Sequence, residues 1–79
     1  MKMVSGYFLW SFNYLNGRRA MQGNFSMSEA GAKDVAAQLS KKKKRTIVLN
    51  GVSYSYSGNT PARAKYQEIA RYSNGKLIR

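Results

Sequence analysis

The chain has no cysteine and no histidine, and its 79 residues include only three acids, Glu29, Asp34 and Glu68. Without cysteine, disulfides, thiol chemistry and cysteine-containing zinc sites are excluded. Most catalytic arrangements need a histidine, a cysteine or paired carboxylates, and Glu29 and Asp34, five positions apart, would not share a helix face. The glycines form neither a phosphate-binding loop nor a dinucleotide fingerprint. The sequence therefore predicts a protein that is not an enzyme and that binds no metal or cofactor.

Long apolar runs are missing as well. No stretch approaches the ~18 apolar residues that span a bilayer. The apolar amino-terminal segment is interrupted by Ser5, Gly6, Ser11 and Asn13, so it lacks the continuous apolar region of a signal peptide. We therefore expect a soluble, cytoplasmic protein without membrane contact, which would be nuclear only in a eukaryotic host.

Positive charge, in contrast, is abundant. Fourteen Lys and Arg against three acids give a net charge of +11. So much charge on a small body is self-repulsive and attracts polyanions. The length allows one small domain over residues 1–79, whose core is expected to supply no more than ~3–5 kcal/mol. A homodimer would add buried surface to that core and stays open as an alternative.

An aromatic segment at the amino terminus predicts the first hairpin. Residues 3–15 lead into Asn16-Gly17, the preferred pair for a type I′ turn, and residues 18–26 return. With Leu15 facing Arg18, alternation sorts the strands into two faces. One face is aromatic and is expected to form core (Phe8, Trp10, Phe12, Tyr14, Phe25). The other is mostly polar (Asn13, Arg18, Gln22, Asn24).

A capped helix is expected next, over residues 27–40. Ser26 and Glu29 match a capping box. Apolar residues then recur at helical spacing (Ala32, Val35, Ala36, Leu39). The run Lys41–Arg45 follows, where cations suit the negative end of the helix dipole.

The second half of the sequence resembles the first in its pattern. Residues 46–49 and 52–57 flank Asn50-Gly51 and predict a second hairpin, with a loop at Gly58-Asn59. Thr60 and Pro61 suit the start of a helix over 61–73, and Asn74-Gly75 suits its end, with a frayed tail at 76–79. The predicted fold is α+β, in the order β-β-α-β-β-α, with both helices on one face of an antiparallel sheet.

The basic residues are the candidate site. Lys41, Lys42, Lys43, Lys44 and Arg45 are expected to neutralise phosphates; the alternative is a solvated helix end. On the predicted second helix Arg63, Gln67 and Arg71 would form one stripe, which is equally interpreted as an ordinary polar surface.

Residues of the first hairpin could read bases. Asn13, Gln22 and Asn24 are of the types that contact base edges, and a two-stranded ribbon fits a major groove. A solvent-facing polar surface explains them as well. Arg18 and Arg19 flank the turn, where they could grip a groove edge or keep the turn soluble.

Tyr54 and Tyr56 could stack on single-stranded bases or belong to the core.

These observations favour a non-enzymatic protein that binds the phosphate backbone of nucleic acid, DNA ahead of RNA. The alternative is a small basic inhibitor or adaptor that binds an acidic or nucleic-acid-binding surface of a larger complex by charge complementarity.

Overall fold

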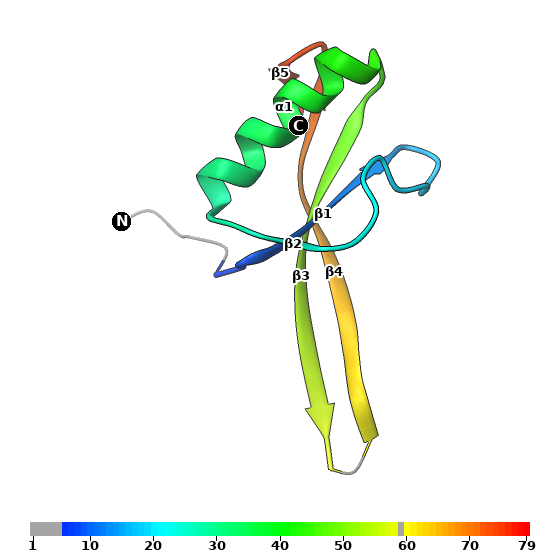
Figure 1. Cartoon of the computed structure of the whole chain (residues 1–79), viewed down its shortest axis with the longest axis vertical. Helices are drawn as coiled ribbons and strands as arrows, with labels where there is room; N and C mark the ends of the chain where they lie inside the picture. The colour runs from blue at the N-terminus through cyan, green and yellow to red at the C-terminus, as the bar shows by residue number, and fades with distance from the viewer. Residues whose placement is uncertain (1–5, 59) are drawn as a thin grey trace.

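One antiparallel sheet and one helix make up the fold in the computed structural model, which describes residues 6–58 and 60–79. The elements are β1 (Leu9–Tyr14), β2 (Phe25–Ser26), α1 (Glu29–Lys43), β3 (Ile47–Ser57), β4 (Thr60–Ser73) and β5 (Lys76–Leu77). The five strands lie in the order β2-β1-β3-β4-β5, and α1 covers one face of the sheet (Figure 1). The α+β prediction is thus confirmed, and the two-helix order β-β-α-β-β-α is wrong.

The first hairpin forms, but in a different register. Gly17 N–H donates to the Tyr14 carbonyl (3.0 Å) and Tyr14 N–H donates to the Arg18 carbonyl (2.8 Å), so the loop holds three residues instead of two. Gly17 has φ +89°, as the left-handed position of such a loop requires. The Asn16 side chain accepts from Arg18 N–H (2.9 Å) and supports this alternative turn.

The returning strand is also much shorter than predicted. Trp10 pairs with Phe25, where the predicted register had Gly23 opposite Trp10, and residues 20–24 form a loop. The aromatic face is confirmed at its centre, because Trp10 and Phe12 are completely buried under the helix. Phe8, in contrast, is 72% exposed and is not core. Residues 3–5 of the predicted strand lie outside the described residues.

The helix begins two residues later and ends three residues later than predicted. Ser28, not Ser26, is the N-cap, and its Oγ accepts from Gly31 N–H (3.1 Å). The capping box is therefore wrong, and the Glu29 carboxylate pairs with Lys33 at 3.0 Å. The apolar stripe is confirmed, with Ala32 and Ala36 fully buried against the sheet. Small side chains here let the helix lie close to the strands.

The predicted turn at Asn50-Gly51 does not exist, because both residues lie inside β3. The ring of Tyr7 covers Gly51 so closely that a Cβ atom there would lie 2.5 Å from the ring. The glycine is therefore needed for this close approach and not for a turn. The chain reverses at Gly58, in the loop predicted there; Asn59 lies outside the described residues.

The predicted second helix is instead the strand β4, which pairs along almost all of β3. Tertiary pairing overrides the helical composition of this segment, because a helix here would leave the long strand β3 unpaired on that edge. The register shifts between Leu49 and Asn50, opposite Ala70 and Glu68, which leaves Ile69 as the extra residue of a bulge. Because of this extra residue, the side chains that follow the bulge point to the opposite face of the sheet from the one that uninterrupted alternation would give them.

Asn74-Gly75, predicted to end a helix, forms a two-residue hairpin loop with positive φ at both residues. It joins β4 to β5, and pairing continues beyond β5, since Ile78 N–H donates to the Arg71 carbonyl (2.9 Å). The frayed tail is therefore wrong as well. The buried Ser40 ties the helix to this turn by accepting from Gly75 N–H (2.8 Å).

Candidate nucleic-acid interface

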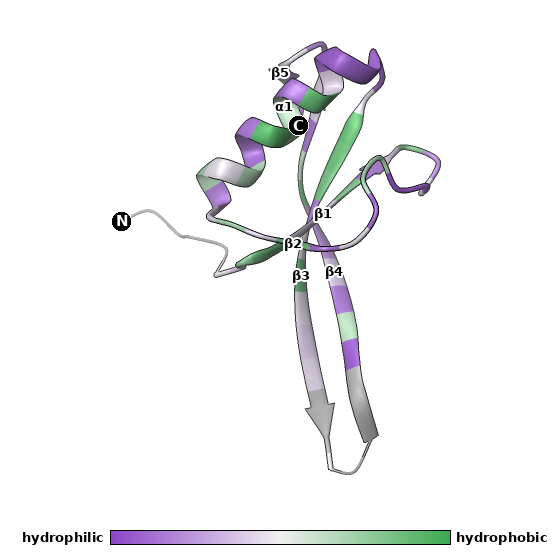
Figure 2. Cartoon of the chain, in the orientation of Figure 1, coloured by the Kyte–Doolittle hydropathy of each residue, from purple (hydrophilic) through white to green (hydrophobic). Residues whose placement is uncertain are grey.

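A two-stranded ribbon extends beyond the rest of the sheet. The pairing of β1 with β3 stops at Val52. Beyond it, the described residues 53–58 and 60–65 pair only between β3 and β4, and they form a hairpin arm (Figure 1). The arm contains Arg63 and Lys65 and no acidic residue. Both cations are exposed, and they alternate onto one face of β4 together with Gln67. Figure 2 shows this alternation as hydrophilic bands along β4.

The opposite face of the arm, together with its base at Tyr66, is aromatic. Tyr54 and Tyr66 belong to the alternate set of residues, and each is 46% exposed. The Tyr66 hydroxyl accepts from Arg19 Nη2 at 3.1 Å, and the Tyr54 hydroxyl accepts from Asn24 Nδ2 at 3.4 Å. The neighbouring Asn24 amide and the Arg19 guanidinium lower the pKa of Tyr66. These rings have the amphipathic character of a stacking surface.

Contacts on both faces brace the base of the arm. On the helix side the Tyr7 hydroxyl donates to Gln67 Oε1 at 2.7 Å, and on the other side the loop residues Arg19 and Asn24 reach Tyr66 and Tyr54. The arm is therefore held in a fixed direction where it leaves the sheet. Such preorganisation lowers the entropy cost of binding.

A second group of cations lies at the end of α1. Lys41, Lys42 and Lys43 occupy its last turn, Lys44 ends it in the left-handed conformation (φ 57°), and all four are exposed. The Arg45 guanidinium lies 3.7 Å from the centre of the Tyr14 ring, which orients it by a cation–π contact. We call residues 41–45 the helix-end cluster.

The described residues contain two ion pairs, Lys33 with Glu29 and Arg71 with Glu68. None of the cations in the helix-end cluster or the arm has an acidic partner within the described part of the chain. These cations are therefore available to an external anion.

The candidate residues do not share one surface. The helix-end cluster and the arm tip lie toward opposite ends of the 43 Å long axis (Figure 1). Arg63 and Arg71 do not form the predicted stripe, because the bulge at Ile69 places Arg71 on the helix-free face of the sheet. There Arg71 Nε donates to Glu68 Oε2 (2.6 Å), and this hydrogen bond lowers the pKa of Glu68.

The polar residues of the first hairpin separate into two groups. Arg19 and Asn24 are engaged within the protein, since Arg19 Nη1 donates to the Gly23 carbonyl (3.0 Å) and to Asn24 Oδ1 (3.2 Å). Arg18, just after the three-residue loop, and Gln22, in the loop of residues 20–24, are exposed. The predicted base-reading strand that would have carried Gln22 and Asn24 is therefore wrong.

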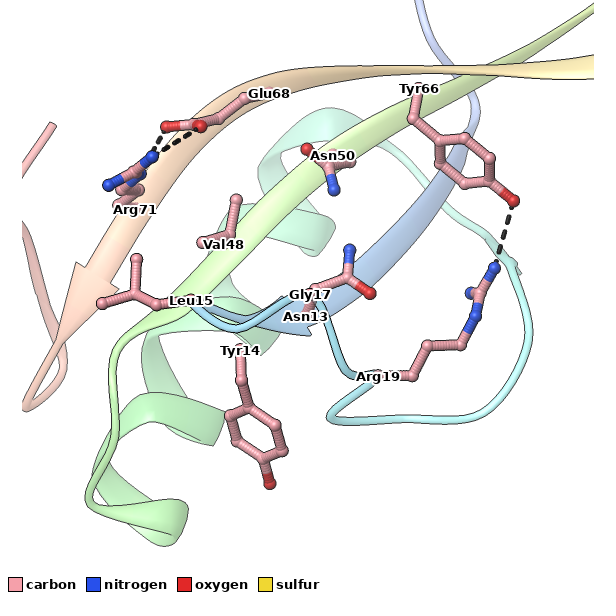
Figure 3. A pocket seen from close by; sticks show the side chains of 10 residues that line it. All are labelled: Asn13, Tyr14, Leu15, Gly17, Arg19, Val48, Asn50, Tyr66, Glu68 and Arg71. Carbon is pink, nitrogen blue, oxygen red and sulfur yellow. Dashed lines mark hydrogen bonds and ion pairs between the residues drawn. The ribbon is translucent and has the colours of Figure 1, made fainter.

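An open pocket occupies the helix-free face of the sheet, with a volume of about 400 Å³. Asn13 from β1 and Asn50 from β3 project into it, Glu68 and Arg71 line one end, and Arg19 and Tyr66 line the other (Figure 3). Only Asn13, Arg19 and Arg71 of this group were candidates from the sequence.

Lys65, Asn50 and Tyr66 were missed as site residues. The signal for Lys65 was the period-two alternation of Arg63, Lys65 and Gln67, which a strand turns to one face. Because the sequence predicts a turn at Asn50-Gly51, Asn50 was not recognised as a strand residue.

Comparison with models of protein families, with curated proteins and with solved structures finds no match to this chain. No helix in the described residues is long and apolar enough to cross a bilayer.

Proposed function

We propose that this protein is a non-enzymatic nucleic-acid-binding protein that prefers duplex DNA to RNA. The hairpin arm enters a groove, and the helix-end cluster contacts the phosphate backbone. The observation that carries the proposal is the arm itself: a braced ribbon of residues 53–65 that bears two exposed cations and no acid.

The dimensions of the arm suit a DNA groove. Five residues of strand rise about 17 Å, whereas the major groove of B-DNA is about 12 Å wide and 8.5 Å deep and admits a two-stranded ribbon. The major groove of duplex RNA is too narrow for side chains to read. DNA is therefore the better partner for this shape.

The separation of the two cationic regions also suits a duplex. With the arm lying lengthwise in the major groove, the 43 Å axis of the protein follows the groove (Figure 1), and the helix-end cluster at its other end meets the phosphate backbone that borders the groove. Neither region has acidic partners within the described residues, so both can replace the counterions of the DNA.

A salt titration tests the proposal. Fluorescence anisotropy of a labelled duplex is measured between low and high salt, with duplex RNA and single-stranded DNA in parallel. Six phosphate contacts, from Lys41–Lys44, Arg63 and Lys65, predict a slope of log K against log salt of about −5. A slope near zero, or no binding of any nucleic acid at low salt, would refute it.

A basic inhibitor or adaptor is the second candidate, favoured by one observation. Leu77 and Ile78, at the β5 edge, are 62% and 55% exposed and lie next to Lys76 in the chain. Exposed apolar residues beside a cation suit a protein partner with an acidic surface. A stoichiometric protein partner that survives nuclease treatment of a lysate, together with a flat salt response toward DNA, would favour this candidate.

A further inference from the structure

We propose that the pocket on the helix-free face of the sheet binds one unpaired nucleobase. The inference rests on the proposed function and assigns it a second mode of contact, in which an extrahelical base enters the protein beside the arm. We call this cavity the base pocket; its principal residues are Asn13, Asn50, Glu68, Arg19 and Tyr66.

The base pocket has the size and position that such a ligand needs. Its volume of about 400 Å³ lies in the range of sites for small organic ligands. The sheet forms its floor, and Leu15 and Gly17 of the first hairpin loop form one wall together with Arg19, which follows the loop (Figure 3). The pocket is open to solvent on the remaining side, so a base still attached to its strand can enter.

Two amides supply the polar contacts. Asn13 and Asn50 lie diagonally across the β1–β3 ladder, because Asn13 pairs with Val48 and Asn50 pairs with Ser11. Asn13 Nδ2 donates to Ser11 Oγ at 2.9 Å, which fixes the amide and leaves its Oδ1 available. The Asn50 side chain has no hydrogen-bond partner among the described residues. Together they offer a donor and acceptors to the edge of a base.

Aromatic and apolar side chains supply a surface for the face of the base. Tyr66 is 46% exposed, and its ring is held by the Arg19 guanidinium, which lies 5.8 Å from the ring centre. Val48 and Leu15 line the other part of the pocket. Unpaired bases in protein complexes stack on aromatic rings and guanidinium planes and are hydrogen-bonded at their edges.

The charge at the Glu68 end of the pocket favours a base over a phosphate group, and Arg19 lies at the other end. The Glu68 carboxylate lines the pocket, and Arg71, the cation nearest to it, is already bound to it by two hydrogen bonds of 2.6 and 3.0 Å. A carboxylate repels phosphate but accepts hydrogen bonds from the amino groups of bases. Because its pKa is lowered by Arg71, Glu68 is ionised at neutral pH.

The base pocket adjoins the arm. Tyr66 lines the pocket and also belongs, with Tyr54, to the aromatic face of the arm. A nucleotide unstacked next to an inserted arm would therefore meet the pocket without leaving the protein surface.

The test uses three versions of one duplex: fully paired, with a single extra base in one strand, and with an abasic residue in place of that base. The wild-type protein is expected to bind the extra-base duplex about tenfold more tightly than the abasic one, a typical effect of one stacked base. Asn50→Leu is expected to remove this preference while leaving the affinity and salt slope for the paired duplex unchanged.

Gln38→Leu is the matched control, since Gln38 is an exposed amide on α1, outside the base pocket, and the variant should keep the preference. Asn50→Ser, too short to reach the base, serves as a second variant if Asn50→Leu does not fold. Equal binding of the extra-base and abasic duplexes, or a preference that survives both Asn50 variants, overturns the inference. In that case salt-dependent binding of the paired duplex leaves the proposed function standing, whereas no binding of any duplex ends both.

Discussion

Neutralising the two cations of the arm should weaken DNA binding more than the loss of charge alone explains. The variant is Arg63→Gln with Lys65→Gln, which lowers the net charge from +11 by two. Both side chains are exposed, and neither has an acidic partner within the described residues. Their removal therefore costs the fold little and takes away two expected phosphate contacts.

The magnitude follows from counterion release. Each phosphate contact contributes about 0.9 to the slope of log K against log salt, so the double variant should change the slope from about −5.4, for six contacts, to about −3.6, for four. If the variant and the wild type bind equally at 1 M salt, the slope difference of about 1.8 makes their affinities differ by about 1.8 log units at 0.1 M salt. The variant should therefore bind roughly 60-fold more weakly at 0.1 M salt.

Lys33→Gln is the control for net charge. Lys33 is ion-paired with Glu29 at 3.0 Å, so its removal should leave the slope almost unchanged. Anisotropy titrations of the three proteins on one duplex compare the slopes. If Lys33→Gln changes the slope by half as much as the double variant, the protein acts only through its total charge, and a specific role of the arm is refuted.

Three further predictions concern stability and are checked by urea or thermal unfolding. Gly51→Ala should destabilise the fold by about 1–3 kcal/mol, because the added Cβ meets the Tyr7 ring at 2.5 Å; the loss should shrink in a Tyr7→Ala background, and a neutral single variant would contradict the packing. Ser40→Ala should cost about 1–3 kcal/mol, because it leaves Gly75 N–H without its acceptor; an unchanged urea midpoint would contradict this. The pKa of Glu68 is lowered from 4.5 by its hydrogen bond to the neighbouring arginine, so the stability it contributes is present above pH 4.5 and is lost as the pH falls through its folded-state pKa. Glu68→Gln should therefore have a lower Tm than wild type at pH 7, and the difference in Tm should shrink as the pH falls below 4.5 and through the lowered pKa of Glu68; a difference that does not change with pH would contradict the assignment.

The helix and the buried aromatic strand could be predicted because their signals are local. Ala32 and Ala36 repeat at helical spacing, and Trp10 and Phe12 alternate at strand spacing. Both pairs are buried where the patterns require. Local sequence could not decide whether Ser26 or Ser28 caps the helix, because Ser26 is the last residue of β2 and its pairing depends on β1.

The second half was mispredicted because three Asn-Gly pairs have three different roles. Asn16-Gly17 lies in a three-residue loop, Asn50-Gly51 lies within a strand, and Asn74-Gly75 forms the two-residue hairpin loop. Which role each pair takes depends on contacts far along the chain, such as the Tyr7 ring over Gly51. Placing the turn at Asn50-Gly51 shortened β3 and left residues 61–73 to their helical propensity.

The candidate site was predicted only in part, because some of it depends on the strand β4, which was predicted as a helix. The helix-end cluster depends on one local run of sequence and is exposed as expected. The arm and the base pocket depend on the pairing of β3 with β4, which brings Asn50 near Glu68 and turns Lys65 beside Arg63. The period-two alternation of Arg63 and Lys65 was a local signal for the arm, whereas no local pattern could reveal that Asn50 and Glu68 are neighbours.

Mapping the DNA contact directly on the wild-type protein tests the central claim most directly. Backbone amide chemical shifts are followed by NMR while a paired duplex is added. We predict the largest changes at residues 41–45 and 63–65, at the two ends of the molecule, with little change in the middle of α1. Changes confined to other surfaces, or none in the arm at saturating DNA, would contradict the account.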